Sequence, residues 1–296
     1  MNAHHGGSWV LAVVGAGSMG AQIAQQAALH GVETRLHDVD PEQLERALAS
    51  NRSQMRRRVE RGRLEAAEME AAQSRVRPAP DLDDAVDGAD IVIEAIVEQL
   101  EPKRRLFAEL DERAPAEALL ASNSSTMGIS QLTEGVRLPE RCCNMHFFYP
   151  PLVMDLVEIV RGPSTSDATV ERAAEFAKAI GRTPVVLNRE IPGFIVNRIL
   201  HMATQEAYRL LDAGVASVED IDIAVEKGLR WPLGPFRLGD LTGLDVTYAA
   251  RKHMYETTGD ERYRPSPALE AKVRAGELGR KTGRGWYQYP AGEEKG

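Results

Sequence analysis

The stretch Val10-Leu-Ala-Val-Val-Gly15-Ala-Gly17-Ser-Met-Gly20 is the strongest local signal in the chain. Its three glycines follow a hydrophobic strand pattern and open an apolar helix. Gly15 permits a tight turn, Gly17 lets the backbone approach a pyrophosphate, and Gly20 lets the helix pack on the sheet. The alternative is a purely structural turn. The stretch predicts a phosphate-binding turn at a helix N-terminus, formed by Gly15, Gly17, Ser18, Met19 and Gly20.

An acidic residue, Asp38, ends the second predicted strand. A carboxylate at this position accepts hydrogen bonds from the ribose hydroxyls of the adenosine and repels a 2′-phosphate, which favours NAD over NADP. Arg35 or His37 could serve such a phosphate instead, and this alternative stays open. Asp40, before Pro41, is expected to cap the next helix.

Short β-branched runs alternate with helical stretches in the first two thirds of the chain, which indicates a doubly wound, mainly parallel α/β sheet of Rossmann type. The expected strands are Val10–Val14, Glu33–His37, Ile91–Ala95, Ala118–Ala121, Cys142–His146, Leu156–Val160 and Pro184–Leu187. The expected helices there are Ser18–His30, Pro41–Arg61, Pro102–Arg113 and Asp167–Ile180, and Gly31 and Gly181 are expected as left-handed caps.

The strand signal vanishes after Pro192-Gly193, the expected hinge. Helices are then expected at Phe194–Asp212, Val218–Lys227, Phe236–Thr257 and Pro267–Ala275. We therefore predict two domains: residues 1–190 bind the dinucleotide, and residues 191–296 form an all-helical domain for substrate binding and dimerisation.

Composition narrows the function classes. The chain has 296 residues and a net charge of −8, which argues against nucleic-acid binding. The only cysteines, Cys142 and Cys143, are adjacent, which fits a reducing cytoplasm. No apolar run reaches the length of a membrane span, and no secretion signal or metal site is expected. His4 and His5 are interpreted as part of a disordered leader rather than as metal ligands.

A histidine and a glutamate stand in neighbouring strands. His146 ends one strand, and Glu158 lies inside the next apolar run, where a carboxylate is costly unless it is paired. If the intervening Pro-Pro turn brings the strands side by side, Glu158 binds one imidazole nitrogen and leaves the other free as a general base. The alternative is a core histidine beside an unrelated glutamate.

Seven motifs in one order, from about residue 9 to residue 289, resemble the L-3-hydroxyacyl-CoA dehydrogenase family. They are Gly15-Ala-Gly-Ser-Met-Gly20, Glu94-Ala-Ile-Val-Glu98, Ala121-Ser-Asn-Ser-Ser125, His146-Phe-Phe, Leu156-Val-Glu158, Pro192-Gly-Phe-Ile-Val-Asn197-Arg and Lys281-Thr-Gly-x-Gly285-Trp-Tyr. The resemblance implies NAD-dependent oxidation of a short-chain (3S)-3-hydroxyacyl-CoA, as in fatty acid metabolism.

Residue by residue, the resemblance implies that His146 takes the proton of the 3-hydroxyl and that Glu158 holds His146. Ser125 and Asn197 match the family's polar residues at the substrate oxygen and the nicotinamide. Further expected cofactor residues are Glu98, Lys103, Ser125, Tyr149 and Lys281. Tyr149 and Asp155 depart from the family's usual asparagine and lysine, which leaves the acyl specificity open.

Six arginines within residues 52–63 are candidates for the CoA 3′-phosphate, although a solvated helix face explains them equally well. Two further hypotheses stay open: a dehydrogenase of a non-CoA compound such as carnitine or L-gulonate, and a non-catalytic NAD-binding protein. The resemblance to dimeric dehydrogenases and the apolar residues of the helical half predict a homodimer formed mainly through residues after Pro192. These apolar residues include Ile199, Leu200, Leu210, Leu211, Val215, Val218, Ile221, Ile223 and Val225.

Overall fold

A computed structural model describes residues 9–289, so His4 and His5 lie outside the described part. The chain divides into two compact units, the first ending at Ile195 and the second beginning at Val196. No helix among the described residues is long and apolar enough to cross a membrane.

The first unit is built on one eight-stranded sheet, with the order β3-β2-β1-β4-β5-β6-β7-β8. All neighbouring strands are parallel except β6 and β7, which are antiparallel. This confirms the predicted mainly parallel sheet. The strands are β1 (Val10–Val14), β2 (Glu33–His37), β3 (Val76–Pro78), β4 (Ile91–Glu94), β5 (Leu119–Ser122), β6 (Cys142–Phe147), β7 (Leu156–Val160) and β8 (Thr183–Leu187).

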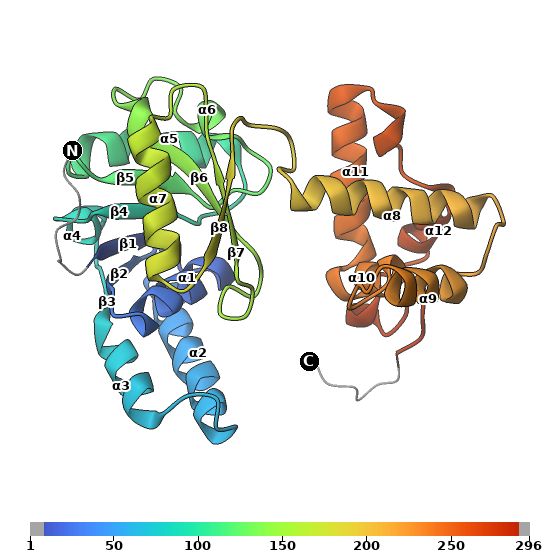
Figure 1. Cartoon of the computed structure of the whole chain (residues 1–296), viewed down its shortest axis with the longest axis horizontal. Helices are drawn as coiled ribbons and strands as arrows, with labels where there is room; N and C mark the ends of the chain where they lie inside the picture. The colour runs from blue at the N-terminus through green and yellow to red at the C-terminus, as the bar shows by residue number, and fades with distance from the viewer. Residues whose placement is uncertain (1–8, 290–296) are drawn as a thin grey trace. The chain divides into compact units, whose positions relative to one another are not determined.

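Helices cover both faces of this sheet, and Figure 1 shows α7 crossing the face nearest the viewer. The helices are α1 (Ser18–Leu29), α2 (Pro41–Glu60), α3 (Ala66–Arg75), α4 (Leu82–Val86), α5 (Leu100–Arg113), α6 (Ile129–Leu132) and α7 (Asp167–Ala179), with a 3₁₀ helix at Pro139–Arg141. Helices α1, α2, α3 and α7 share one apolar core, and α4, α5 and α6 share the other. In β1, Leu11 and Val13 face the first core while Ala12 and Val14 face the second, because successive strand side chains alternate.

Besides the 3₁₀ helix at Pro139–Arg141, one strand and three helices of this unit were not predicted: β3, α3, α4 and α6. Strand β3 has three residues and ends at a proline, which an edge strand tolerates. Helix α3 buries only Ala72, so its sequence has no strong apolar stripe. The predicted caps Gly31 and Gly181 both have positive φ, 84° and 68°, as expected for left-handed caps.

The second unit is helical, as predicted. Its helices are α8 (Val196–Asp212), α9 (Val218–Gly228), α10 (Pro235–Thr242), α11 (Leu244–Thr258) and α12 (Pro267–Arg274), with 3₁₀ helices at Glu261–Tyr263 and Arg280–Thr282. The single helix predicted over Phe236–Thr257 is wrong, because Gly243 has φ 101° and separates α10 from α11. The helix predicted to begin at Phe194 begins at Val196, because Phe194 has φ 48°.

Candidate active site

The glycine-rich turn between β1 and α1 has the geometry of a phosphate site. Gly15 has φ 107°, and a Cβ on it would lie 2.5 Å from the carbonyl oxygen of Ala95. A Cβ on Gly20 would lie 1.9 Å from the Gly15 carbonyl oxygen, whereas the space above Gly17 is open. Gly17 caps α1 without a side-chain hydrogen bond, so the first N–H groups of the helix can meet an anion.

Asp38 follows β2 and faces this turn. Its Oδ2 accepts a hydrogen bond from the Ala16 N–H at 2.7 Å, and its Oδ1 accepts one from the Asp40 N–H at 3.0 Å. Each carboxylate oxygen retains a lone pair for a ribose hydroxyl. Asp40 accepts from the Glu42 N–H at 3.0 Å, which confirms its predicted role as a helix cap.

The two residues that could have served a 2′-phosphate are both engaged elsewhere. The Arg35 guanidinium donates to the carbonyl oxygens of Asp84 and Asp87. The buried His37 ring is 3.1 Å from the Ala79 carbonyl oxygen through Nδ1. A cavity of about 940 Å³ lies beside Asp38, and its lining includes Gly15, Gly17, Ser18, Met19, Ile96 and Arg105. These residues fit a dinucleotide.

His146 and Glu158 form a buried pair. They are directly opposite each other in the antiparallel register of β6 and β7, which is why the two strands bring them together. The His146 Nδ1 lies 2.8 Å from Glu158 Oε2. A carboxylate only accepts hydrogen bonds, so Nδ1 is the donor in this contact and Nε2 is the ring atom left to act as a base.

The linker before α8 also contacts this pair, which the sequence did not reveal. The Ile195 N–H donates to Glu158 Oε1 at 3.0 Å. The buried Phe194 ring lies 5.5 Å from the His146 ring, and Phe148 lies 4.4 Å from it. A backbone donor leaves no trace in an amino-acid sequence. In a sequence, glycine is the usual sign of a positive φ, so the φ of 48° at Phe194 could not be predicted.

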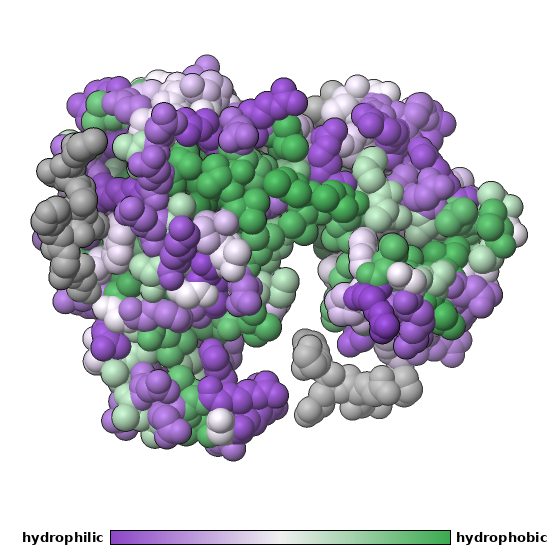
Figure 2. Space-filling model, in the orientation of Figure 1, coloured by the Kyte–Doolittle hydropathy of each residue, from purple (hydrophilic) through white to green (hydrophobic). Residues whose placement is uncertain are grey.

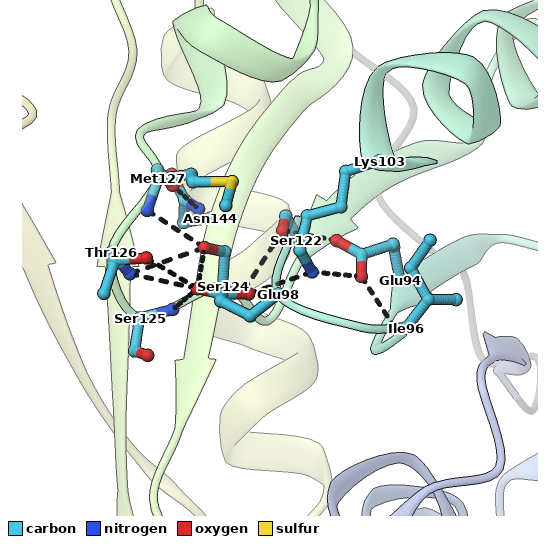
Figure 3. Close-up of polar contacts among 10 residues, drawn as sticks. All are labelled: Glu94, Ile96, Glu98, Lys103, Ser122, Ser124, Ser125, Thr126, Met127 and Asn144. Carbon is cyan, nitrogen blue, oxygen red and sulfur yellow. Dashed lines mark hydrogen bonds and ion pairs between the residues drawn. The ribbon is translucent and has the colours of Figure 1, made fainter. Parts of the chain in front are cut away.

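Ser125 lies in a turn after β5 that Glu98 holds (Figure 3). Glu98 Oε1 accepts from the Ser124 hydroxyl at 2.6 Å and from the Ser125 N–H at 3.2 Å. Thr126 adds its N–H at 3.3 Å and its hydroxyl at 2.8 Å. Burial alone would raise the pKa of Glu98, but the Ser124 hydrogen bond and the charge of Lys103 outweigh it and hold the pKa below its usual value.

Lys103 is buried and lies between two carboxylates. Its side chain is 1% exposed, with Nζ 2.5 Å from Glu94 Oε1 and 3.2 Å from Glu98 Oε2. Glu94 also accepts from the Ser122 hydroxyl at 2.6 Å. Sequence reasoning missed Glu94 as a site residue, although it interrupts an apolar run, as Glu158 does.

The remaining predicted residues belong to other segments of the chain. Tyr149, in the β6–β7 loop, is 64% exposed. The exposed Asp155 lies 3.6 Å from Arg182. Asn197 and Lys281 belong to the second unit, where the Lys281 ammonium lies 2.5 Å from Asp245. Among the described residues, the structure thus forms two clusters of predicted site residues. One is His146 with Glu158, and the other is Glu98 with Lys103 and the turn of Ser125.

Two family models match the chain. Residues 10–191 match the NAD-binding domain of 3-hydroxyacyl-CoA dehydrogenase, and residues 193–289 match its C-terminal domain. The chain belongs to the 3-hydroxyacyl-CoA dehydrogenase family. This confirms the predicted resemblance, the Rossmann-type fold class and NAD as the cofactor. The protein is an NAD-dependent 3-hydroxyacyl-CoA dehydrogenase, and the comparisons do not favour the alternative hypotheses.

Relatives of this dehydrogenase cover nearly the whole chain. A probable 3-hydroxybutyryl-CoA dehydrogenase of Bacillus subtilis is 40% identical over 96% of this chain and 97% of its own length. A 3-hydroxyadipyl-CoA dehydrogenase of Escherichia coli is 40% identical over 96% of this chain, which spans 60% of that relative. The crystal structure of (S)-3-hydroxybutyryl-CoA dehydrogenase from Ralstonia eutropha is 36% identical, with a TM-score of 0.90, over 96% of this chain and all of that one.

Proposed function

We propose that His146 is the general base for a short-chain (3S)-3-hydroxyacyl-CoA, with 3-hydroxybutyryl-CoA as the preferred substrate. The observation that carries this proposal is the buried contact between His146 Nδ1 and Glu158 Oε2 at 2.8 Å. It leaves Nε2 free to take the proton of the 3-hydroxyl. NAD, once bound, supplies the acceptor for the hydride from C3 of the substrate.

The charge on Glu158 stabilises the imidazolium that forms when His146 takes the proton. Phe148 and Phe194 contact the ring and restrict its tilt. Ser125, held by Glu98, and Asn197, near the start of α8, bond the substrate oxygen in this proposal. The reaction therefore uses residues from both sides of the linker, and the second unit serves for substrate binding and dimerisation.

Most of the residues proposed to bind the cofactor belong to the first unit, and Lys281 belongs to the second. Gly15, Gly17, Ser18, Met19 and Gly20 would meet the pyrophosphate, and Asp38 the adenosine ribose. Glu98, Tyr149 and Lys281 are proposed at the nicotinamide end. The six arginines of residues 52–63, which lie in and just after α2, would meet the 3′-phosphate of CoA. We also propose a cytoplasmic location, which fits the two free cysteines of β6.

Steady-state kinetics over a substrate panel tests this function. The panel contains 3-hydroxybutyryl-CoA, longer 3-hydroxyacyl-CoAs, 3-hydroxyadipyl-CoA, carnitine and L-gulonate, each with NAD and with NADP. We expect the highest kcat/KM with 3-hydroxybutyryl-CoA and NAD. A higher value with 3-hydroxyadipyl-CoA would contradict the short-chain assignment, because that substrate carries a second carboxylate.

The same substrate made on dephospho-CoA tests the arginines of residues 52–63. Loss of the 3′-phosphate should raise KM and leave kcat nearly unchanged, because a contact remote from C3 contributes equally to the ground state and the transition state. An equal KM for the two substrates would indicate that these arginines form a solvated surface.

A further inference from the structure

We propose that Asn144 is a positioning residue: its side-chain amide holds the loop that carries Ser125 at a fixed place relative to His146. The Ser125 loop, residues 123–128, runs between β5 and α6, and Figure 3 shows Asn144 next to Met127 of this loop. The inference rests on the proposed function where it gives Ser125 a contact with the substrate oxygen.

Asn144 and His146 point from the same face of β6, because successive side chains of a strand alternate between the two faces of a sheet. Met145, which lies between them, belongs to the first core, and Ile129 at the start of α6 belongs to the second. Asn144 and His146 therefore share the face that α6 covers, with Cα atoms roughly 6.6 Å apart along the strand. Strand β6 thus sets the separation between the general base and the amide.

The amide of Asn144 binds two backbone groups where the Ser125 loop meets α6. The side chain is fully buried. Its Oδ1 accepts from the Ile129 N–H at 2.8 Å, and its Nδ2 donates to the Met127 carbonyl oxygen at 3.0 Å. A carboxamide carries an acceptor and a donor side by side, whereas a carboxylate offers only acceptors and an aliphatic side chain offers neither. Asparagine at this position therefore ties the end of the loop to β6.

The contacts of Asn144 reach Ser125 because the turn between them is closed by hydrogen bonds. The Ser124 hydroxyl oxygen accepts from the Met127 N–H at 3.0 Å, and the same hydroxyl donates to Glu98 at 2.6 Å. A shift of Met127 therefore carries Ser125 with it. In Figure 3 the Ser125 hydroxyl points away from these contacts, which leaves it available for a substrate oxygen.

The start of α6 has a second anchor, so the contribution of Asn144 can be measured on its own. Glu190 accepts from the Ser130 N–H at 2.7 Å and from the Ser130 hydroxyl at 2.5 Å. Its carboxyl group also lies against Gly128, where a Cβ would be 2.6 Å from Glu190 Cδ. The helix is thus held at Ser130 by a contact that a change at Asn144 does not remove.

Hydrogen exchange tests the hold of Asn144 on the loop without reference to activity. Asn144→Leu keeps a branched side chain and removes both amide contacts. In the full-length protein without NAD, the Ile129 amide should exchange at least about tenfold faster than in the wild type, while the Ser130 amide changes less than about threefold. An unchanged rate at Ile129, or an equal increase at both amides, would overturn the inference.

Steady-state kinetics at saturating NAD tests the positioning role. We expect Asn144→Leu to lower kcat/KM for 3-hydroxybutyryl-CoA about 10- to 100-fold, because a displacement of about 1 Å at a group that contacts the substrate costs up to about 100-fold in rate. An unchanged kcat/KM would overturn the role.

The matched control is Gln26→Met, which removes another buried amide and keeps a side chain of similar length. The Gln26 amide lies 2.8 Å from the Ile180 carbonyl oxygen and 3.2 Å from His30 Nδ1, contacts that join the end of α1 to the end of α7. This variant should change kcat/KM less than about threefold, because it loses buried hydrogen bonds without touching the Ser125 loop. A loss as large as that of Asn144→Leu would show that the kinetic effect follows from stability alone.

A double-mutant cycle with Ser125→Ala separates positioning from a general loss of structure. If Asn144 acts through Ser125, adding Asn144→Leu to Ser125→Ala should lower kcat/KM less than about threefold further. Losses that multiply would overturn the inference, because Asn144 would then act independently of Ser125. Should Asn144→Leu fail to fold, Asn144→Ala removes the same two contacts with a smaller side chain and takes its place in each measurement.

Failure of the proposed function has a different signature. Ser125→Ala without any effect on kcat/KM would refute the contact of Ser125 with the substrate, and with it the positioning role. Unchanged exchange at Ile129, together with a large effect of Ser125→Ala, would refute the role of Asn144 and leave the proposed function intact.

Discussion

Two carboxylates of the first unit, Glu94 and Glu158, are completely buried, and each has a different kind of partner. Glu158 has the titratable His146 on one oxygen and a backbone N–H on the other. Glu94 has the ammonium group of Lys103. A carboxylate paired with histidine can orient a ring that exchanges a proton, whereas one paired with lysine holds a buried ion pair. The first arrangement suits a general base and the second suits a fixed support.

Replacing His146 by Gln removes the basic nitrogen and preserves most of the side-chain volume. We expect kcat to fall by about 10²–10⁴, the factor that general base catalysis contributes. The Kd for NADH should stay nearly the same, because no residue of the glycine-rich turn changes. Stopped-flow or steady-state NADH formation measures the effect. A variant with more than half of the wild-type kcat would refute the assignment of the base.

Replacing Glu158 by Gln should invert the histidine tautomer. The Ile195 N–H needs an acceptor, so the amide oxygen of Gln faces Ile195 and the NH₂ group faces His146. Nδ1 must then accept, and the proton moves to Nε2, the atom that should be basic. We expect a large loss of kcat and a change of tautomer in the ¹⁵N NMR spectrum of the ring. Unchanged ring signals would show that the pair does not set the tautomer.

Asp38 should exclude NADP. Because Arg35 and His37 are engaged by backbone carbonyls, no described neighbour on β2 offsets the repulsion of a 2′-phosphate. We expect kcat/KM with NAD to exceed that with NADP by at least about tenfold, or ~1.4 kcal/mol. Asp38→Ala should reduce the ratio of kcat/KM with NAD to kcat/KM with NADP, mainly by lowering kcat/KM with NAD. Equal use of both cofactors by the wild type would contradict this role.

At the scale of elements, the linker between β8 and α8 is fixed to the first unit at two places. Glu190 accepts from the Ser130 N–H at 2.7 Å, and the Ile195 N–H reaches Glu158. Between them, Phe194 is 1% exposed and packs with Val160 and Leu187. The linker therefore ends against His146 and supports its ring.

Phe194→Leu tests this support, because it keeps an apolar side chain and removes the aromatic contact with His146. We expect kcat to fall about three- to tenfold, as for a modest misplacement of a catalytic group. Phe176→Leu is the matched control, since Phe176 is equally buried but packs against Trp9. Both variants should lose about 1–2 kcal/mol of unfolding free energy. If the two variants lower kcat by the same factor, Phe194 affects only stability and not the position of the His146 ring.

The elements with strong periodicity were predictable from the sequence, and those fixed by single residues were not. Strand β1 is a continuous apolar run that leads into a glycine-rich turn and an apolar helix, a pattern that few other structures explain. The break between α10 and α11 depends on the φ of Gly243, and a single glycine inside a helical pattern is also tolerated. The His146–Glu158 pair was predictable because the carboxylate interrupts a strand. The burial of Lys103 was not, because a lysine in the first turn of a helix is usually solvated.

At the scale of the whole molecule, each unit has a core of its own. The core of the second unit includes Tyr208, Ile221, Phe236, Leu244 and Leu269. Of the apolar residues predicted to form an interface, Ile221 is buried in this core, and Leu210, Leu211 and Val218 pack against it. Ile199, Val215 and Ile223 remain exposed. The helical unit thus buries only part of its apolar surface, and Figure 2 shows green, apolar areas on it.

Exposed apolar surface of this kind usually marks an interface, and two-fold pairing is the commonest closed arrangement. Ile223 is 52% exposed on α9, and the exposed Val215 and Leu229 precede and follow that helix. We expect the intact chain, of 32.5 kDa, to form a homodimer through residues after Pro192, and multi-angle light scattering at micromolar concentration should report about twice that mass.

Ile223→Glu should shift the mass toward the monomer, because two-fold symmetry places the new charge in the interface twice. The control Val153→Glu, on an exposed valine of the first unit, should leave the dimer intact. A wild-type particle of about 32 kDa would refute the dimer, and a dimer unaffected by Ile223→Glu would move the interface away from α9.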